Sequence, residues 1–338
     1  VDYRADHCEV WAPSQSPQRV LAAVIKESGL PENKIVVHSL SPGGAFGRRL
    51  AQDYVHHAVK IALQHGRPIK FMSTRESDMQ SGHYRTAAAA RMRGQYSEDG
   101  KLVAIAATLN VAGQGGMAKP QGWRGYLDVA LREVQERWSG EIARPYNGTG
   151  GIADLPYALE GYELRCHYES LPVSTGFWRS VDHSYTCFFV ESFMDELAHA
   201  AAVNPLAFRL KNLAPTHRMA TVLRTLQDML PPQKSADTGM GFACHEAFGT
   251  CLALAVELEA VPGEVCRVSR AWCAIDPGMA IDPENIVAQV EGGVLFGLSA
   301  AVGEEITLQG GRVQSSNFHD YPILRMNQAP AISVNIVA

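Results

Sequence analysis

Hydrophobic and polar residues alternate in a regular order through the first part of the chain. The pattern predicts three short strands, at 9–11, 34–40 and 68–72. Between consecutive strands, apolar residues three and four positions apart predict amphipathic helices that end at Gly29 and Gly66. This β-α-β-α-β order predicts a largely parallel sheet with right-handed crossovers, whose ligand-binding loops lie at the carboxyl ends of the strands.

The middle of the chain carries a hairpin signal followed by a long helix. The predicted strands span 88–96, 102–111 and 162–170. The Asp99-Gly100 pair between the first two is typical of a tight hairpin turn. Apolar spacing predicts a helix over about 184–202. Three carboxylates are interpreted as the solvated face of that helix, namely Glu191, Asp195 and Glu196.

A stretch rich in Pro, Thr and Gln divides the remainder of the chain. Residues 216–238 include Pro231-Pro232 and are predicted to be a linker. The length of 338 residues favours two domains, which we place at 1–215 and 239–338. Two strands and a helix are predicted in the second domain, at 239–258, at 264–274 and from Asp282 onward. The fold class expected from this mixture is α+β, a mixed α/β chain.

Composition and charge argue against several classes of function. With a net charge of −5 and dispersed basic residues, the chain is not expected to bind nucleic acid. No apolar run is expected to reach the roughly 20 residues of a transmembrane segment. The seven cysteines include no C-x-x-C pair, so no iron–sulfur cluster is expected on this chain and any electron relay belongs to a partner. The cellular compartment stays open between cytoplasm and periplasm.

A glycine-rich stretch, SPGGAFGRR at residues 41–49, separates the second predicted strand from the second predicted helix. Glycines there let the backbone approach a ligand closely, and free N–H groups at a helix start favour an anion. Arg48 and Arg49 would add fixed positive charge. The alternative is a tight strand-to-helix turn that needs glycine only for positive φ. Neither nucleotide-binding glycine motif matches this stretch.

The residues from Gly43 to Arg49 resemble the pterin-contacting loop of the molybdenum hydroxylases, the xanthine dehydrogenase and aldehyde oxidase superfamily. Six further stretches resemble, in the same order, the molybdenum-binding subunits of isoquinoline oxidoreductase and related membrane-linked aldehyde dehydrogenases. They are residues 9–15, 176–181, 245–249, 274–278, 289–293 and 316–322. The resemblance implies two molybdopterin-binding subdomains with sheets flanked by helices, the second of them incomplete.

The resemblance also implies roles for individual residues. Gln15 matches the glutamine that hydrogen-bonds an oxygen ligand of molybdenum, Arg179 the arginine that orients substrate, and Gln289 a glutamine that binds the pterin. Cofactor contacts are further implied for Gly43, Gly44, Ala45, Phe46, Gly47, Arg48 and Arg179, with Phe46 beside the substrate channel. No protein side chain is implied as a metal ligand. Structural alternatives remain: Gln15 caps a helix, Arg179 pairs with Asp182 or Glu191, and Gln289 is a plain surface residue.

The implied activity is hydroxylation of N-heteroaromatic compounds or oxidation of aldehydes, with water as the oxygen source. The implied cofactor is molybdopterin in a cytosine dinucleotide form, and the implied partners are a 2Fe-2S subunit and a cytochrome c subunit. The family's glycine-glutamine pterin motif and its Gly-Val-Gly-Glu base motif have no counterpart here, and neither Glu291 nor Glu304 matches the base. We therefore expect part of a molybdenum subunit; the alternative is a non-catalytic remnant or assembly module without cofactor.

Overall fold

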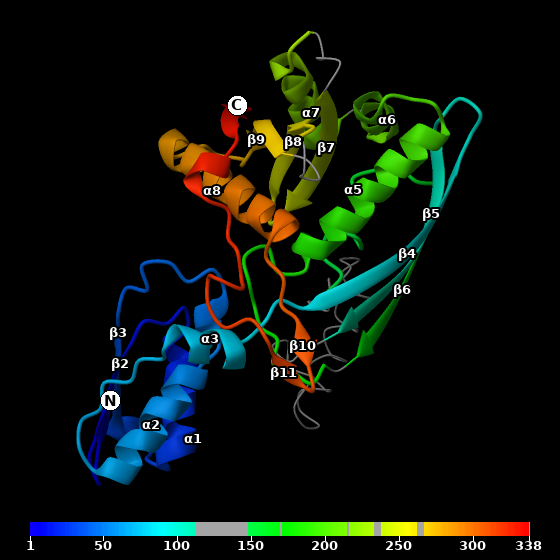
Figure 1. Cartoon of the computed structure of the whole chain (residues 1–338). Coiled ribbons are helices and arrows are strands. Elements are labelled where there is room, and N and C mark those ends of the chain that lie inside the picture. The colour runs from blue at the N-terminus through cyan, green and yellow to red at the C-terminus, as the bar shows by residue number, and fades with distance from the viewer. Residues whose placement is uncertain (113–147, 170, 215, 233–237, 262–266, 338) are drawn as a thin grey trace.

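The computed structural model describes residues 1–112, 148–169, 171–214, 216–232, 238–261 and 267–337. Figure 1 shows a small N-terminal unit, drawn in blue, beside a larger unit that holds a long curved sheet and a second sheet above it. The mixed α/β class predicted from the sequence is confirmed. Residues 112–150, a stretch with several glycines, lie largely outside the described residues.

The N-terminal unit is a small sheet with helices on one face. Its strands are β1 (Asp2–Tyr3), β2 (Cys8–Ala12) and β3 (Ile35–Ser39), with β1 antiparallel to β2 and β2 parallel to β3. These helices are α1 (Pro17–Ser28) and α2 (Asp53–His65), and α3 (Arg75–Ser81) follows them in the chain. Val10 of β2 packs with Val24 and Val59 beneath α1 and α2, whereas its neighbour Trp11 is exposed on the other face.

The third strand predicted at 68–72 is wrong. Ile69 exchanges two main-chain hydrogen bonds with Val1, at 2.8 and 2.9 Å, and its neighbours do not extend this pair into a ladder. The chain then enters α3, whose N-cap Thr74 accepts a hydrogen bond from Ser77 N. Strand propensity is present at 68–72, but a strand also needs a partner of matching length.

The long sheet in the middle confirms the predicted hairpin. Its strands are β4 (Ala87–Tyr96), β5 (Leu102–Ala112) and β6 (Gly161–Glu169), with β4 antiparallel and β6 parallel to β5. Helix α5 (His183–Ala200) packs against β4, and α6 (Pro205–Asn212) follows it, capped by the Asn204 side chain. Leu109 of β5 and Met194 of α5 are fully buried in the core between them.

The second sheet carries a helix on each face. Its strand order is β12-β9-β8-β7, with β7 (Thr238–Ala247), β8 (Thr250–Glu259), β9 (Arg267–Asp276) and β12 (Ala331–Ile336). Alternate residues of β8 face opposite ways: Ala253 packs in the core that contains α7 (Arg218–Met229), and Leu252 packs with Val290 of α8 (Pro283–Val302). The cap predicted at Asp282 is confirmed, since its side chain accepts a hydrogen bond from Asn285 N at 3.1 Å.

The remaining elements of the described residues are short. They are the 3-10 turns at Glu32–Lys34, Arg48–Leu50 and Met326–Gln328 and the two-residue strands β10 (Leu308–Gln309) and β11 (Arg312–Val313).

The stretch predicted as one strand over 239–258 is two strands. The chain reverses at Phe248 and Gly249, which have φ angles of 51° and 80°, and β7 pairs with β8 through ten residues on each side. A two-residue hairpin turn of type I′ has positive φ at both central positions. Phenylalanine is uncommon at the first of these positions. The apolar pattern of the sequence therefore shows no break at the turn.

The stretch predicted as a linker at 216–238 contains α7. Its buried residues Met219, Val222, Leu223 and Leu226 follow helical spacing and join the core shared by α5 and both large sheets. A single apolar cluster therefore spans the predicted boundary. The prolines that suggested a linker, Pro231 and Pro232, follow the helix.

Glu191 does not lie on a solvated face. It is 4% exposed and pairs with the fully buried Arg209 of α6 through a 2.8 Å contact, and it also accepts from Tyr157 OH. Asp195, one turn along α5, binds the same guanidinium at 2.5 Å. Helical periodicity identified this face of α5 correctly as polar. Part of the face is nevertheless buried, because α6 packs on it and places Arg209 against Glu191 and Asp195.

Candidate functional site

The glycine loop follows β3 and stands largely exposed, with a backbone that few residue types tolerate. Gly43, Phe46 and Gly47 have φ angles of 71°, 48° and 91°. A Cβ on Gly47 would lie 2.7 Å from the carbonyl oxygen of Phe177, so glycine is required there for positive φ and for close packing. The predicted turn is therefore present, and it also docks onto the segment that leads to Arg179.

The loop does not run directly into a helix. A 3-10 turn at Arg48–Leu50 intervenes, and α2 begins only at Asp53. The N–H groups that the loop offers to a ligand are therefore those of the loop itself and not those of a helix terminus. This corrects the expectation of an anion site at the start of α2.

Gln15 binds the loop and does not cap a helix. Its Oε1 accepts a hydrogen bond from Gly47 N at 3.1 Å, and its own N–H donates to the Arg49 carbonyl at 3.3 Å. The N-cap of α1 is Ser16, which makes no side-chain capping bond. The structure thus joins Gln15 to the glycine loop, although Gln15 and Gly47 are 32 residues apart in the chain.

Several donors at this place are free to bind a ligand. Among the described residues, the N–H groups of Gly43, Gly44, Ala45 and Phe46 have no protein acceptor. Both the loop and the Gln15 side chain are exposed. Only the side-chain oxygen of Gln15 binds the loop, which leaves its side-chain NH2 group to donate to a ligand. A cluster of donors suits a ligand rich in phosphate and carbonyl oxygens, so the residues present fit a molybdopterin group.

Arg48 is already paired within the protein. Its guanidinium donates to both carboxylate oxygens of Asp53, at 2.9 and 2.8 Å, and Asp78 lies 3.6 Å away. Burial acts to raise the pKa of Asp53, but the hydrogen bonds and charge of Arg48 hold that pKa below its usual range. Arg48 therefore fixes the end of the loop, and its charge is largely neutralised.

Arg179 lies against α8. Its Nη2 donates to the main-chain oxygen of Gln289 at 3.1 Å and to the Gln289 side-chain oxygen at 3.4 Å. The alternative partners are engaged elsewhere: Glu191 binds Arg209, and Asp182 accepts from Gly150 N at 2.7 Å. Gln289 is an exposed helix residue, yet both of its oxygens hold the guanidinium.

The segment before Arg179 is held by residues 83–85. Trp178 Nε1 donates to the His83 carbonyl at 3.0 Å, and Gly176 N donates to the Tyr84 carbonyl at 2.9 Å. Arg85 Nη1 donates to the Arg179 carbonyl at 2.9 Å. These contacts, which sequence reasoning missed, place the backbone of Arg179. No motif marked residues 83–85, because their role arises from a main-chain pairing between distant segments.

Two aromatic rings lie beside the guanidinium. Arg179 Cζ lies 5.6 Å from the ring centre of Phe46 and 5.9 Å from that of Phe296, and the two rings stack at 5.9 Å with a 23° angle between their planes. Phe296 was missed by sequence reasoning. It stands seven residues after Gln289, so both lie on one face of α8, which is the signal that could have found it.

Glu304 is not available as a free carboxylate. Ser299 Oγ donates to one of its oxygens and Tyr321 OH donates to the other at 2.9 Å. Burial, and then the hydrogen bond to Glu304, raise the pKa of the Tyr321 hydroxyl. The Glu304 carboxylate therefore holds the end of α8 against residues 321–324 and has a structural role.

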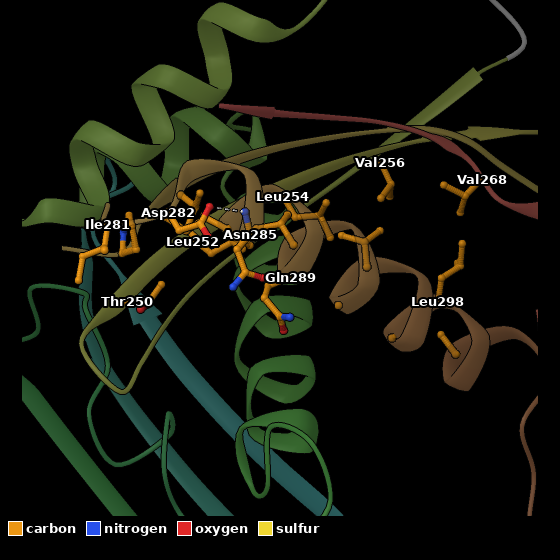
Figure 2. Close-up of a pocket in the computed structure, with 18 of the residues that line it drawn as sticks. Thr250, Leu252, Leu254, Val256, Val268, Ile281, Asp282, Asn285, Gln289 and Leu298 are labelled. Carbon is orange, nitrogen blue, oxygen red and sulfur yellow. Dashed lines mark hydrogen bonds between the residues drawn. The ribbon is translucent and has the colours of Figure 1, made fainter. Parts of the chain in front are cut away.

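A cavity of about 720 Å³ lies between α8 and the second sheet. Figure 2 shows its apolar wall of Leu252, Leu254 and Val256 from β8, with Gln289 at its side. Neither Arg179 nor Phe46 lines it. The convergence of Arg179, Phe46 and Phe296 is therefore a separate place that shares Gln289 with this cavity.

Helix α8 differs from the expectation about membranes. It is 20 residues long, and an 18-residue window within it has a mean hydropathy of 1.4, so it meets the length and composition of a membrane span, the one described helix that does. It nevertheless carries Glu291 and Gln289 and packs through Val290 on β8 and β9. Length and composition alone do not show a membrane span, because helices that pack on a sheet pass the same test.

Comparison with known proteins matches nearly the whole chain. Two profiles, both described as a molybdopterin cofactor-binding domain, match residues 1–127 and 170–330. The beta subunit of isoquinoline 1-oxidoreductase from Brevundimonas diminuta is 32% identical over 97% of this chain and 41% of its own length. A membrane-bound aldehyde dehydrogenase from Gluconacetobacter polyoxogenes is 28% identical over 97% of this chain and 44% of its own length. The chain thus spans less than half the length of these relatives.

Solved structures share the fold. Quinoline 2-oxidoreductase from Pseudomonas putida 86 superposes with a TM-score of 0.79 at 12% identity, over 98% of this chain and 65% of that one. An aldehyde oxidoreductase from Desulfovibrio gigas gives a TM-score of 0.77 at 13% identity, over 98% of this chain and 52% of the other. At these identities the likeness concerns the fold alone.

Proposed function

Since the chain belongs to the molybdopterin cofactor-binding family, on the branch of the molybdenum hydroxylases, we propose that it is the molybdopterin-binding part of an oxidoreductase. The proposed reaction is hydroxylation of N-heteroaromatic compounds or oxidation of aldehydes, with water as the oxygen source. Support comes from the names of the relatives, an isoquinoline 1-oxidoreductase and an aldehyde dehydrogenase. Because the chain spans less than half of these relatives, the activity is proposed for the assembled enzyme.

The glycine loop and Gln15 are proposed to hold the cofactor. The free N–H groups from Gly43 to Phe46 and the Gln15 side-chain amide would donate to its oxygens, and Gly47 lets the loop lie close to Phe177. When bound, the molybdopterin group supplies the two-electron redox chemistry. The protein's contribution is to bind it, to orient the substrate and to exclude competing reactions.

Arg179 is proposed to orient the substrate. Among the described residues, only its Nη2 meets a protein acceptor, so Nη1 and Nε remain to donate to a carbonyl oxygen or ring heteroatom. A guanidinium suits an atom that gains negative charge during reaction. The half-exposed ring of Phe46 offers a flat apolar surface beside it, on which an aromatic substrate can stack.

The cofactor form and the partners are also proposed. We propose a cytosine dinucleotide form of molybdopterin, electron transfer to a 2Fe-2S subunit, and onward transfer to a cytochrome c subunit. The relative from Brevundimonas diminuta is named as a beta subunit, which supports a multi-subunit enzyme. Acid hydrolysis of the purified complex tests the cofactor form: release of cytidine monophosphate supports it, and release of no nucleotide contradicts it.

One observation carries the proposal most of the way: Phe46 of the glycine loop, Arg179 and Gln289 converge at one exposed place. The test uses the complex purified from cells that make the molybdenum cofactor. It is incubated with a quinoline in isotopically labelled water, with an artificial electron acceptor. The proposal predicts label in the product. Turnover without label in the product contradicts the proposed reaction. A complex that contains no molybdenum and shows no activity favours the alternative of a non-catalytic module.

A further inference from the structure

Phe296 stands where the glycine loop, the Arg179 segment and α8 meet. Its ring stacks on Phe46 at 5.9 Å, and the Arg179 guanidinium lies 5.9 Å from its centre. Arg179 thus interacts with both rings at once, from a sequence position far from either. These contacts join residues matched by the first cofactor-binding profile to residues matched by the second.

Phe296 is not a residue of the core beneath α8. That core contains Val290 with Val294 and Ile286 packed around it, and Phe296 does not belong to this cluster of described residues. The helix instead presents Gln289 and Phe296, seven residues apart, to Arg179. Between them lies the backbone of Gly292 and Gly293, where an added Cβ would touch the guanidinium at 3.9 and 3.6 Å.

Phe46 requires an external contact to keep its place. It has a φ of 48°, an unfavourable conformation for a bulky residue, and 49% of its surface is exposed. Such a backbone persists where surrounding contacts hold it. Within its own loop the ring lies over Gly44, and from outside the loop it meets Phe296 and Arg179.

Within the described part of the chain, Arg179 likewise has a single hydrogen-bonding anchor, Nη2 on Gln289. One anchored nitrogen leaves the guanidinium plane free to turn, and the two rings restrict that turn. We propose that Phe296 is a positioning residue that holds Phe46 and the guanidinium plane of Arg179 in the geometry the substrate meets. This inference rests on the proposed function only for its consequence in catalysis; the geometric part concerns this chain alone.

The first arm of the test needs no cofactor. The Arg179 Nε–H resonance is assigned in the labelled chain by its loss in Arg179→Lys, and its ring-current shift is compared among variants. Phe296→Leu removes a ring and should move the resonance. Phe296→Tyr keeps the ring and should leave it nearly unchanged. Phe188→Leu, a matched change at an exposed phenylalanine of α5, should also leave it unchanged.

The second arm uses the assembled, cofactor-loaded enzyme. Phe296→Leu should lower kcat/KM by roughly ten- to a hundredfold, as expected when a positioning group is displaced by about 1 Å, with pterin content equal to wild type. Phe296→Tyr should restore most of the activity. An unchanged resonance in Phe296→Leu overturns the inference whatever the enzyme does. A moved resonance with unchanged kcat/KM overturns the catalytic consequence, whereas failure of every variant and the wild type to bind pterin contradicts the proposed function instead.

Discussion

The Arg179 guanidinium donates through Nη2 to both oxygens of Gln289, a residue 110 positions later in the chain. This contact fixes the loop after β6 against α8. Because Phe46 lies beside the same guanidinium, the glycine loop of the N-terminal unit is drawn into one site with the second sheet's helix. The proposed cofactor and substrate positions therefore depend on the packing of both units.

Arg179→Lys is expected to impair turnover more than assembly. Lysine keeps the charge but loses the planar guanidinium. One nitrogen of that group binds the Gln289 oxygens while its other nitrogens are left to donate to a substrate. The expected loss in kcat/KM of the assembled enzyme is roughly ten- to a hundredfold, as for hydrogen bonds made by a charged group. Pterin content should not change. Arg165→Lys, at an exposed ion pair of β6, is the matched control and should be silent; normal kinetics in Arg179→Lys would show a purely structural role.

Gly47→Ala is expected to destabilise the protein and loosen the glycine loop. The new Cβ would stand 2.7 Å from the Phe177 carbonyl at a φ of 91°. We expect a loss of about 2–3 kcal/mol in unfolding free energy, measured by denaturant titration. Gly43→Ala has similar φ strain but nothing within 4 Å, so it should cost only about 1 kcal/mol. Equal effects of the two variants would contradict the close contact with Phe177.

Arg209→Met is expected to destabilise the core strongly. It removes the fully buried cation that pairs with Glu191, whose side chain is 5% exposed, and so leaves a buried carboxylate without its positively charged partner. Breaking such a pair costs about 3–5 kcal/mol. Arg165→Met removes an exposed partner of Glu163 and should cost less than about 1 kcal/mol. Thermal unfolding of both variants measures the difference, and similar melting temperatures would refute the structural role of the buried pair.

His245 is expected to make stability depend on pH. Burial, and then the nearby charge of His183 at 2.8 Å, lower the pKa of His245 to about 4. In the unfolded chain its pKa is about 6.5, so the unfolded state binds more protons between these values. This contribution to stability is fully present above about pH 6.5 and is lost as the pH falls toward about 4. Unfolding free energies of wild type and His245→Gln should therefore converge on acidification; a constant difference across this range would contradict the assignment.

Much of the fold was predictable because local chemistry specified it. The Asp99-Gly100 turn, the Asp282 cap and the helical spacing of α5 each act within a few residues. The turn at Phe248 was missed because a phenylalanine with positive φ carries no turn signal. Helix α7 was missed because the Pro, Thr and Gln residues of this stretch, which are common in linkers, were given more weight than the helical spacing of its apolar residues.

The candidate site was predictable only as a set of separate residues. Gln15, Phe46, Arg179 and Gln289 were identified by resemblance, and the structure brings Gln15 to Gly47 and Arg179 to Gln289. Arg85 and Phe296 act through tertiary contacts, namely a bond to a carbonyl oxygen and a ring against a ring. Such roles depend on distant segments meeting, which no local pattern records.

The measurement closest to the central claim is the molybdenum and pterin content of the assembled complex with Gly44→Val. A Cβ on Gly44 would meet only the ring edge of Phe46, at 3.1 Å, so the fold should tolerate the change while the side chain blocks approach to the loop N–H groups. Gly297→Val, on α8 with nothing within 4 Å, is the matched control. We predict wild-type content in the control and a fall of about tenfold or more in Gly44→Val, equivalent to about 1.4 kcal/mol of binding. Wild-type pterin content in Gly44→Val would contradict the assignment of the glycine loop as the cofactor cradle.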